Sequence, residues 1–309
     1  MEQLPLLSRF TEKAYSLGFA AIGFSRPARP PHMDAFLRRL REGRHGDMAW
    51  LERNLDVRED PRRLLSGCRT IISLARPYPS QKPATPEGLT VSRYARPDAE
   101  DYHVELKRLC GELGKFIQRA FPDSRSRTCV DSAPILERDI AYAAGLGFIG
   151  KNSMLIIPGI GSGVFLAEIL TTADIPFPAA SPLESLCGDC TRCMDACPTG
   201  ALEAPYLVDA SKCLSYLTIE WKGKVDEKTA EKMGDCFLGC DRCQEACPLN
   251  PADDSTCVAL PSAREFFLMD EQAFMKRFGR TALSRPGLAK IRSNLMAMGR
   301  TAFTQIELR

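Results

Sequence analysis

Residues 187–198 read Cys187-Gly-Asp-Cys190-Thr-Arg-Cys193-Met-Asp-Ala-Cys197-Pro198, which is C-x2-C-x2-C-x3-C-P. In the bacterial ferredoxins that carry this run, three thiolates ligate one [4Fe–4S] cubane and the fourth ligates a neighbouring cluster. A zinc ribbon, the alternative for clustered cysteines, uses separated C-x2-C pairs instead. This stretch therefore predicts a module that holds two [4Fe–4S] clusters.

A second, incomplete run follows as Cys240-Asp-Arg-Cys243-Gln-Glu-Ala-Cys247-Pro248, with Phe237 where its first cysteine would stand. Crossed ligation assigns Cys187, Cys190, Cys193 and Cys247 to the first cluster, and Cys197, Cys240 and Cys243 to the second. The missing fourth ligand is either Cys213 or Cys236, and spacing alone leaves both open.

The composition limits the classes of protein. The chain has 309 residues, enough for about two domains, and its 13 cysteines are an odd number. The N-terminus has no uninterrupted apolar stretch of a secretion signal, so a disulfide scaffold is disfavoured and a reducing cytoplasm is expected. The apolar stretch 154–170 is broken by a proline and three glycines, which predicts buried strands and no membrane span. A net charge of +2 implies no general attraction to nucleic acid.

Hydrophobic spacing predicts a mixture of helices and strands without a clean repeat in about the first 180 residues, which we interpret as one α/β sandwich-like domain. We expect helices at 5–20, 34–55, 101–120 and 134–144, the last with Pro134 in its first turn, and strands at 20–24, 70–75 and 127–130. Two further apolar strands, 154–157 and 164–170, are expected to pair with each other. A proline-rich link at 175–182 marks the boundary before the cysteine runs, and residues 261–309 look helical.

Two motifs carry alternative interpretations. Residues 145–152, Gly-Leu-Gly-Phe-Ile-Gly-Lys-Asn, fit G-x-G-x-x-G, but a nucleotide loop needs a strand before it and a helix after it, and here the predicted order is reversed. The glycines are better explained by tight turns or by close approach to a flat ligand. Asp131 follows a short strand and would be a general acid if burial raised its pKa, but a helix cap is the simpler interpretation.

Several stretches together resemble the epoxyqueuosine reductase family. The most specific are Val130-Asp-Ser-Ala-Pro-Ile-Leu-Glu-Arg138, the glycine motif at 145–152, and Cys213-Leu-Ser-Tyr-Leu-Thr-Ile-Glu220. Further matching stretches are Arg58-Glu-Asp-Pro61, Ser92-Arg-Tyr-Ala95, Asp101-Tyr-His103 and the segment 239–250. The resemblance covers most of residues 1–300 in order.

The resemblance implies an α+β protein: a nitroreductase-like α/β sandwich that binds cobalamin (1–176), a two-cluster ferredoxin-like domain (177–256) and a helical C-terminal segment (257–309). It implies that the clusters reduce cobalamin, whose cobalt attacks the epoxide of epoxyqueuosine in tRNA, with Asp131 as proton donor. It also implies Cys213 as the fourth ligand of the second cluster. The positions expected to line the corrin are Arg58, Ser92, Asp131, Leu155, Leu166 and Ser215.

The expected partners are tRNA, whose anticodon stem-loop carries the epoxyqueuosine, and a low-potential electron donor, with a monomeric protein. We expect the chain to lack the helical-repeat extension of longer relatives, which leaves open how tRNA docks. Candidate basic surfaces are residues 261–309, with nine basic and four acidic residues (9 − 4 = +5), and the arginines Arg38, Arg39, Arg41, Arg44, Arg53, Arg62 and Arg63. The alternatives are a corrinoid reductase of a small molecule, such as a dehalogenase, and a non-catalytic electron carrier.

Overall fold

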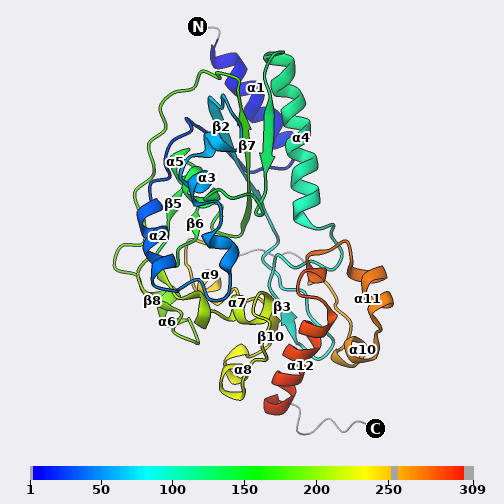
Figure 1. Ribbon diagram of the computed structural model, residues 1–309. Coiled ribbons are helices and arrows are strands. Elements are labelled where there is room, and N and C mark those ends of the chain that lie inside the picture. The colour runs from blue at the N-terminus through cyan, green and yellow to red at the C-terminus, as the bar shows by residue number, and fades with distance from the viewer. Residues whose placement is uncertain (1–2, 252–256, 303–309) are drawn as a thin grey trace.

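The structure is a computed structural model that describes residues 3–251 and 257–302. A four-stranded antiparallel sheet forms the centre of its N-terminal body (Figure 1). The strands lie in the order β1 (Ala21–Ser25), β2 (Thr70–Pro77), β7 (Val164–Thr171) and β4 (Ser126–Cys129). β2 and β7 pair along their whole length, from Thr70 opposite Thr171 to Pro77 opposite Val164.

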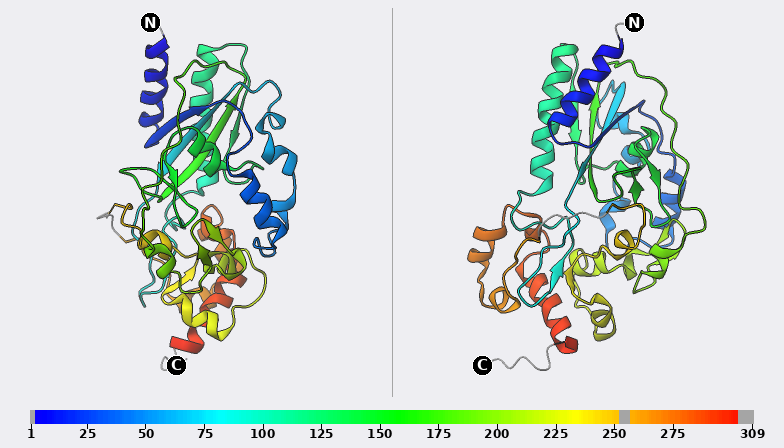
Figure 2. Two further views of the ribbon diagram at one scale, coloured as in Figure 1. Left: turned by 90° about the vertical axis from the view of Figure 1, so that its left-hand side faces the viewer. Right: turned by 180° about the vertical axis from the view of Figure 1, so that it is seen from behind.

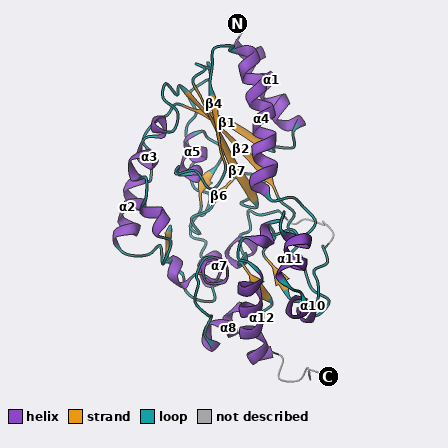
Figure 3. Ribbon diagram, turned by 45° about the vertical axis from the view of Figure 1, so that its right-hand side comes forward, coloured by secondary structure: helices purple, strands orange, loops and turns teal. Residues whose placement is uncertain are grey.

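Helices cover both faces of this sheet (Figure 3). On one face, Ile72 and Leu74 of β2 pack with α1 (Gln3–Ser16) and α4 (Tyr102–Ala120). Residues on the opposite side of β2, such as Ile71, join Ile140 of α5 (Glu137–Ala143). Successive strand residues point to opposite faces, so both faces of β2 are apolar and both are covered. The α/β sandwich predicted from the sequence is confirmed.

The helix expected at 34–55 is wrong as a single element. The segment forms α2 (Met33–Arg41), the 3-10 helix η1 (Ala49–Glu52) and α3 (Leu55–Glu59), followed by η2 (Pro61–Arg63). Gly43 and Gly46 both have positive φ angles, of 67° and 58°. This left-handed conformation ends a helix and suits glycine. These short helices lie beside the sheet body (Figure 1).

Two other local predictions are corrected. α5 begins at Glu137, three residues after Pro134. The strands at 154–157 and 164–170 do not pair with each other, because β6 (Leu155–Ile156) forms a hairpin with β5 (Phe148–Ile149) while β7 takes the place between β2 and β4. Gly147 permits the hairpin, since a Cβ there would lie 2.2 Å from the Ile156 carbonyl oxygen.

The C-terminal half lies below the sheet body (Figure 2). Its described residues from 263 to 302 are mainly helical, as predicted for 261–309, and residues 303–309 lie outside the described residues. Among the described residues no helix is both long and apolar enough to cross a membrane. Its elements are α6 (Arg192–Asp195), β8 (Leu202–Ala204), β9 (Leu207–Val208), η3 (Ala210–Lys212), α7 (Leu214–Ile219), α8 (Glu227–Met233), β10 (Cys236–Leu238), α9 (Arg242–Glu245), α10 (Ala263–Leu268), α11 (Glu271–Phe278), η4 (Ala282–Ser284) and α12 (Leu288–Ala302), with β10 parallel to β3 (Thr90–Val91).

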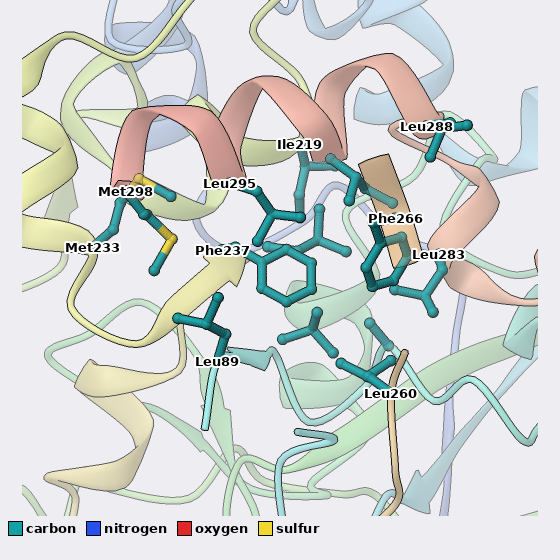
Figure 4. Packing of buried hydrophobic residues seen from close by; sticks show 14 of the residues in the cluster. Leu89, Ile219, Met233, Phe237, Leu260, Phe266, Leu283, Leu288, Leu295 and Met298 are labelled. Carbon is teal, nitrogen blue, oxygen red and sulfur yellow. The ribbon is translucent and has the colours of Figure 1, made fainter. Parts of the chain in front are cut away.

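Phe237, which replaces a cysteine of the second run, lies at the centre of a second hydrophobic core (Figure 4). Its side chain is fully buried and meets Phe266 of α10 with ring centroids 5.9 Å apart. The same cluster includes Val91 of β3 and Leu295 of α12. This core thus joins three stretches of chain that the sequence separates, and the domain boundaries remain a prediction.

Candidate active site

The four cysteines predicted for the first cluster line one small pocket. They are Cys187, Cys190, Cys193 and Cys247, and Lys151 and Arg192 lie beside them. Cys187 and Cys190 precede the short helix α6 and Cys193 lies within it, while Cys247 follows α9 of the second run. The four cysteines that crossed ligation assigns to one cluster therefore lie together, and their ligation of that cluster stays a prediction.

The cysteines predicted for the second cluster also gather. Burial raises the pKa of the Cys243 thiol, and its neighbours Cys213, Cys240 and Cys197 raise it further. Cys236 makes other contacts, because its thiol donates to the carbonyl oxygens of Leu238 at 3.4 Å and Gly239 at 3.6 Å. The structure therefore groups Cys213 with the other three sulfurs.

Backbone amides point at several of these sulfurs. Burial would raise the pKa of Cys197, but hydrogen bonds from Leu202, Thr199 and Ala201 outweigh it and lower the pKa. The Cys213 sulfur receives the amides of Ser215 and Tyr216. Thiolates that receive amide hydrogen bonds are the ligands that iron–sulfur clusters use. The donor set fits two [4Fe–4S] clusters.

The glycine motif at 145–152 ends in two residues that hold the cysteine loops. Lys151 Nζ donates to the carbonyl oxygens of Gly188 at 2.5 Å and Cys190 at 3.1 Å. Asn152 Nδ2 donates to the carbonyl oxygen of Cys243 at 3.3 Å. The Lys-Asn pair that resembles a phosphate loop thus connects the sheet body to both cysteine runs.

A cavity of about 690 Å³ lies between α2, η1, α5 and the β5–β6 hairpin. Its lining includes the arginines Arg39, Arg58 and Arg138 and the aromatic side chains Phe36, Trp50 and Tyr142. Two polar atoms of lining residues, His45 Nδ1 and Ser153 Oγ, are buried without a hydrogen-bond partner. A ligand with flat apolar faces, amide groups and a negative charge fits this lining. Cobalamin has all three features.

The six positions expected to line the corrin are not all in this cavity. Arg58 and Asp131 line it. The Ser92 amide instead donates to the Leu238 carbonyl at 2.8 Å, and Leu155 and Leu166 pack in an apolar cluster against the sheet. The backbone amide of Ser215 donates a hydrogen bond to the Cys213 sulfur. The structure brings Arg58 and Asp131 together in the cavity and leaves the other four outside its lining.

Side chains from two other elements contact Asp131. Its backbone has the left-handed φ of 53°, which non-glycine residues rarely adopt. Its Oδ2 accepts hydrogen bonds from Tyr102 Oη at 3.1 Å, His103 Nε2 at 3.0 Å and Arg285 Nη1 at 3.2 Å. Tyr102 and His103 lie at the start of α4, and Arg285 is the C-cap residue of η4.

Both sequence-based explanations of Asp131 need correction. It is not a helix cap, because α5 begins at Glu137 with Leu136 at its N-cap. Burial acts to raise the pKa of Asp131, as expected, but the hydrogen bond from His103 and the charge of Arg285 outweigh burial, so the pKa lies below its usual range. Asp131 is therefore a carboxylate at neutral pH.

Sequence reasoning missed several neighbours of Asp131. Glu137 Oε1 accepts the Asp131 amide at 2.5 Å, and burial and the Asp131 charge raise the pKa of Glu137 to about 8. His103 was recognisable as part of Asp101-Tyr-His103. Arg285 carried no signal, because it lies 154 residues from Asp131 in the chain.

The candidate arginines for tRNA differ in their surroundings. Arg44 pairs with Glu42 and Glu203, Arg62 with Asp60, and Arg63 with Asp56. Arg38, Arg41 and Arg53 are exposed, and no ion pair found in the described part of the chain includes them. In the basic tail, Glu307 and Arg309 lie outside the described residues.

Two protein-family descriptions match the chain. Residues 58–132 match "Epoxyqueuosine reductase QueG, DUF1730", and residues 186–250 match "4Fe-4S double cluster binding domain". The epoxyqueuosine reductase of Leadbetterella byssophila is 36% identical over 91% of this chain and 94% of its own length. That of Escherichia coli is 36% identical over 95% of this chain and 81% of its own length.

Solved structures agree with these sequence matches. A crystal structure of epoxyqueuosine reductase with an epoxyqueuosine-modified tRNA-Tyr stem loop superposes with a TM-score of 0.85 at 31% identity, covering 96% of this chain and 81% of the other. A structure of the Bacillus subtilis enzyme, with its catalytic aspartate loop swung out of the active site, gives 0.85 at 30% identity over 96% of this chain and 81% of that one.

Proposed function

The chain belongs to the epoxyqueuosine reductase family, and on that premise we propose that it reduces epoxyqueuosine in tRNA to queuosine. The observation that carries the proposal is that Asp131 lines a large cavity whose Arg39 lies close enough to Cys213, of the second set of cysteines, to feel its charge. The cavity supplies space for a large cofactor and the cysteines supply a route for electrons.

Two [4Fe–4S] clusters and cobalamin are the cofactors. When bound, the clusters would supply single electrons and the corrinoid would supply the nucleophile for opening the epoxide. Cys187, Cys190, Cys193 and Cys247 would hold the first cluster, and Cys197, Cys213, Cys240 and Cys243 the second. Arg58, Arg39 and Arg138 would face the negative charge of the cofactor or substrate, and the cavity walls would exclude water from it.

Asp131 would protonate the oxygen that leaves the epoxide carbon. An alkoxide is a poor leaving group and a strong base, so a positioned acid lowers the barrier by delivering a proton as the bond breaks. The hydrogen bonds from Tyr102, His103 and Arg285 fix the carboxyl group in one orientation. This fixed orientation supports a role at the reacting oxygen, because misplaced acids lose much of their effect.

The substrate and the compartment follow from the same premise. We propose that the modified nucleoside enters the cavity while the surrounding tRNA lies across the arginine-rich helix α2. The electron donor is a low-potential carrier, which would approach the first cluster, where Cys187 and Cys190 are partly exposed. The cytoplasm, a reducing compartment that contains tRNA, is the location we propose.

The test is conversion of tRNA that carries epoxyqueuosine by anaerobically purified protein, with cobalamin and a low-potential reductant added. Digested nucleosides are analysed by mass spectrometry for a product lighter by one oxygen. The proposal requires this product from the wild type and its loss in Asp131→Ala. Intact clusters and bound corrin without any conversion would refute the tRNA assignment.

A further inference from the structure

The Asp-Tyr-His sequence at the start of α4 places an imidazole between two carboxylates. Asp101 Oδ1 accepts the backbone N–H of His103 at 2.8 Å as the helix cap. The same oxygen lies 2.7 Å from His103 Nδ1. At the other side of the ring, His103 Nε2 lies 3.0 Å from Asp131 Oδ2. Both ring nitrogens therefore face carboxylate oxygens.

This geometry favours the doubly protonated imidazolium, because an ionised carboxylate only accepts hydrogen bonds and each ring nitrogen must then donate. The hydrogen bond to Asp131 raises the pKa of His103, burial opposes this, and the bond to Asp101 adds to the increase. The pKa of Asp131 is lowered in the same contact. At rest the proton thus belongs to His103, and Asp131 is its ionised partner.

We propose that His103 supplies the proton that Asp131 delivers to the epoxide oxygen, and that Asp101 is the positioning residue that holds the imidazole for this transfer. The inference rests on the proposed function and extends it to a second acid. A carboxylate that is ionised at rest cannot protonate the leaving oxygen by itself, so the proton must come from a neighbour. Of the three donors to Asp131 Oδ2, the His103 imidazolium is a stronger acid than the Tyr102 hydroxyl or the Arg285 guanidinium.

The reaction takes up electrons and protons in equal numbers. Conversion of an epoxide to an alkene and water consumes two electrons, from the low-potential donor, and two protons. As the first C–O bond breaks, His103 Nε2 gives its proton to Asp131, and the Asp131 carboxyl passes it to the oxygen, which leaves His103 neutral and Asp131 ionised again. Solvent then recharges His103, whose side chain is 21% exposed. The second proton converts the departing hydroxyl group into water along the same path.

Other groups that face Asp131 must be separated from His103 in any pH profile. Tyr102 contacts the same oxygen, but burial raises its pKa and it stays protonated. Arg285 stays charged, held between Asp131 and Glu220. Glu137, which accepts the Asp131 amide from α5, titrates near pH 8 because burial and the Asp131 charge raise its pKa to about 8. Glu137 is therefore the group most easily confused with His103.

The experiment is the pH dependence of single-turnover conversion by the anaerobic holoprotein at saturating tRNA. The wild-type rate should fall as the pH rises through the pKa of His103. His103→Gln keeps a polar side chain at both carboxylates but carries no transferable proton. We expect its rate near pH 7.5 to fall by about 10²-fold, in the range of general acid catalysis, and the fall in rate to begin at lower pH. Asp101→Asn should also move the pH limb, which is the pH range over which the rate falls, to lower pH, but by less.

Two variants are matched controls for the position of the pH limb. Tyr102→Phe removes a hydrogen bond from the same Asp131 oxygen and should leave the limb in place. Glu137→Gln should also leave it in place, whatever the change in overall rate. A limb that moves with Glu137→Gln but not with His103→Gln would overturn the inference.

A second measurement needs no turnover. The chain has three histidines, so the ring-nitrogen NMR signals of His103 can be assigned by their loss in His103→Gln. Its pKa should lie above the usual value and should fall in Asp131→Asn and in Asp101→Asn. A His103 pKa that neither change lowers would also overturn the inference. If the wild type converts no tRNA at any pH, the proposed function and the proton path both fail, whereas conversion with an unmoved limb refutes only the proton path.

Discussion

At the scale of single residues, Cys213 and Cys236 present the sharpest choice, because the sequence allows either as the last cluster ligand. Cys213 lies with Cys197, Cys240 and Cys243, whereas Cys236 donates its thiol hydrogen to nearby carbonyl oxygens. We predict that Cys213→Ser lowers iron from about eight to about four atoms per chain, the content of one cubane. Iron and sulfide analysis of anaerobically purified protein measures this.

Cys236→Ser is the matched control, since it changes a buried cysteine only 23 positions further along the chain. It should retain about eight irons, because two cubanes remain ligated. Iron loss in Cys236→Ser with full iron in Cys213→Ser would reverse the assignment.

Glu168 is a second residue with a testable consequence. It lies in the middle of β7, fully buried, and neither carboxylate oxygen has a hydrogen-bond partner. Burial and then the charge of Glu137 raise its pKa well above the ordinary value. The folded chain therefore keeps the proton at pH values where the unfolded chain releases it, so the native state loses stability as pH rises above the unfolded pKa.

Glu168→Gln removes this ionisation and keeps the side-chain shape. We predict that the variant gains stability over the wild type as pH rises from 5 to 8, by about 1.4 kcal/mol for each unit by which burial raises the pKa. Denaturant unfolding of both proteins at each pH measures the difference. A difference that is equal at pH 5 and pH 8 would contradict the prediction.

Single residues differ in how far the sequence alone predicts their surroundings. The gathering of the cysteines into two sets was predictable because ligand spacing is a local property of the chain. The state of Asp131 was not, since it depends on His103 and Arg285, which other elements bring to it. Four of the six expected corrin positions lie outside the cavity lining, because a motif identifies residue types and cannot give the direction in which each side chain points.

At the scale of elements, α10 offers adjacent residues with opposite surroundings. Phe266 is fully buried against Phe237 and Phe278, while Phe267 is 41% exposed. We predict that Phe266→Ala lowers the free energy of unfolding by about 3–5 kcal/mol, as large-to-small changes in cores do. Phe267→Ala should stay within about 0.5 kcal/mol of the wild type.

Thermal or denaturant unfolding of the two variants measures this difference. Equal losses would mean that α10 does not pack on the core around Phe237. The comparison uses neighbours on one helix, so both substitutions have the same helix propensity.

Elements with strong periodicity were the ones that the sequence predicted well. α4 was expected at 101–120 and is observed at Tyr102–Ala120, because its apolar residues recur at helical spacing over five turns. The pairing of β6 was predicted wrongly, because a short apolar run indicates a strand without indicating its partner. Contact between Gly147 and Ile156 decided that pairing, and it is visible only in three dimensions.

At the scale of the whole molecule, three distant stretches of chain meet at Asp131. Arg285 bridges Asp131 of the sheet body and Glu220, which caps α7 beside the second set of cysteines. Lys151 and Asn152 make a second connection between the sheet body and the cysteine runs. Contacts between the sheet body and the C-terminal half thus fix the position of the cavity relative to the two sets of cysteines.

We expect the arginines of α2 to form the surface that nucleic acid contacts. Arg39 lines the cavity, and Arg38 and Arg41 of the same helix are exposed. A polyanion that delivers one nucleoside to the cavity would pass over these side chains. Each arginine that neutralises a phosphate releases counterions, so its removal weakens binding and reduces the salt dependence of affinity.

We therefore predict that Arg41→Ala weakens tRNA binding and lowers the slope of log affinity against log salt by about one. Arg62→Ala is the matched control, because Arg62 is exposed like Arg41 but already pairs with Asp60 at 2.7 Å, and it should change the slope less. Titration of tRNA at several salt concentrations measures both. Equal slopes for the wild type and Arg41→Ala would exclude this end of α2 from the tRNA-binding surface.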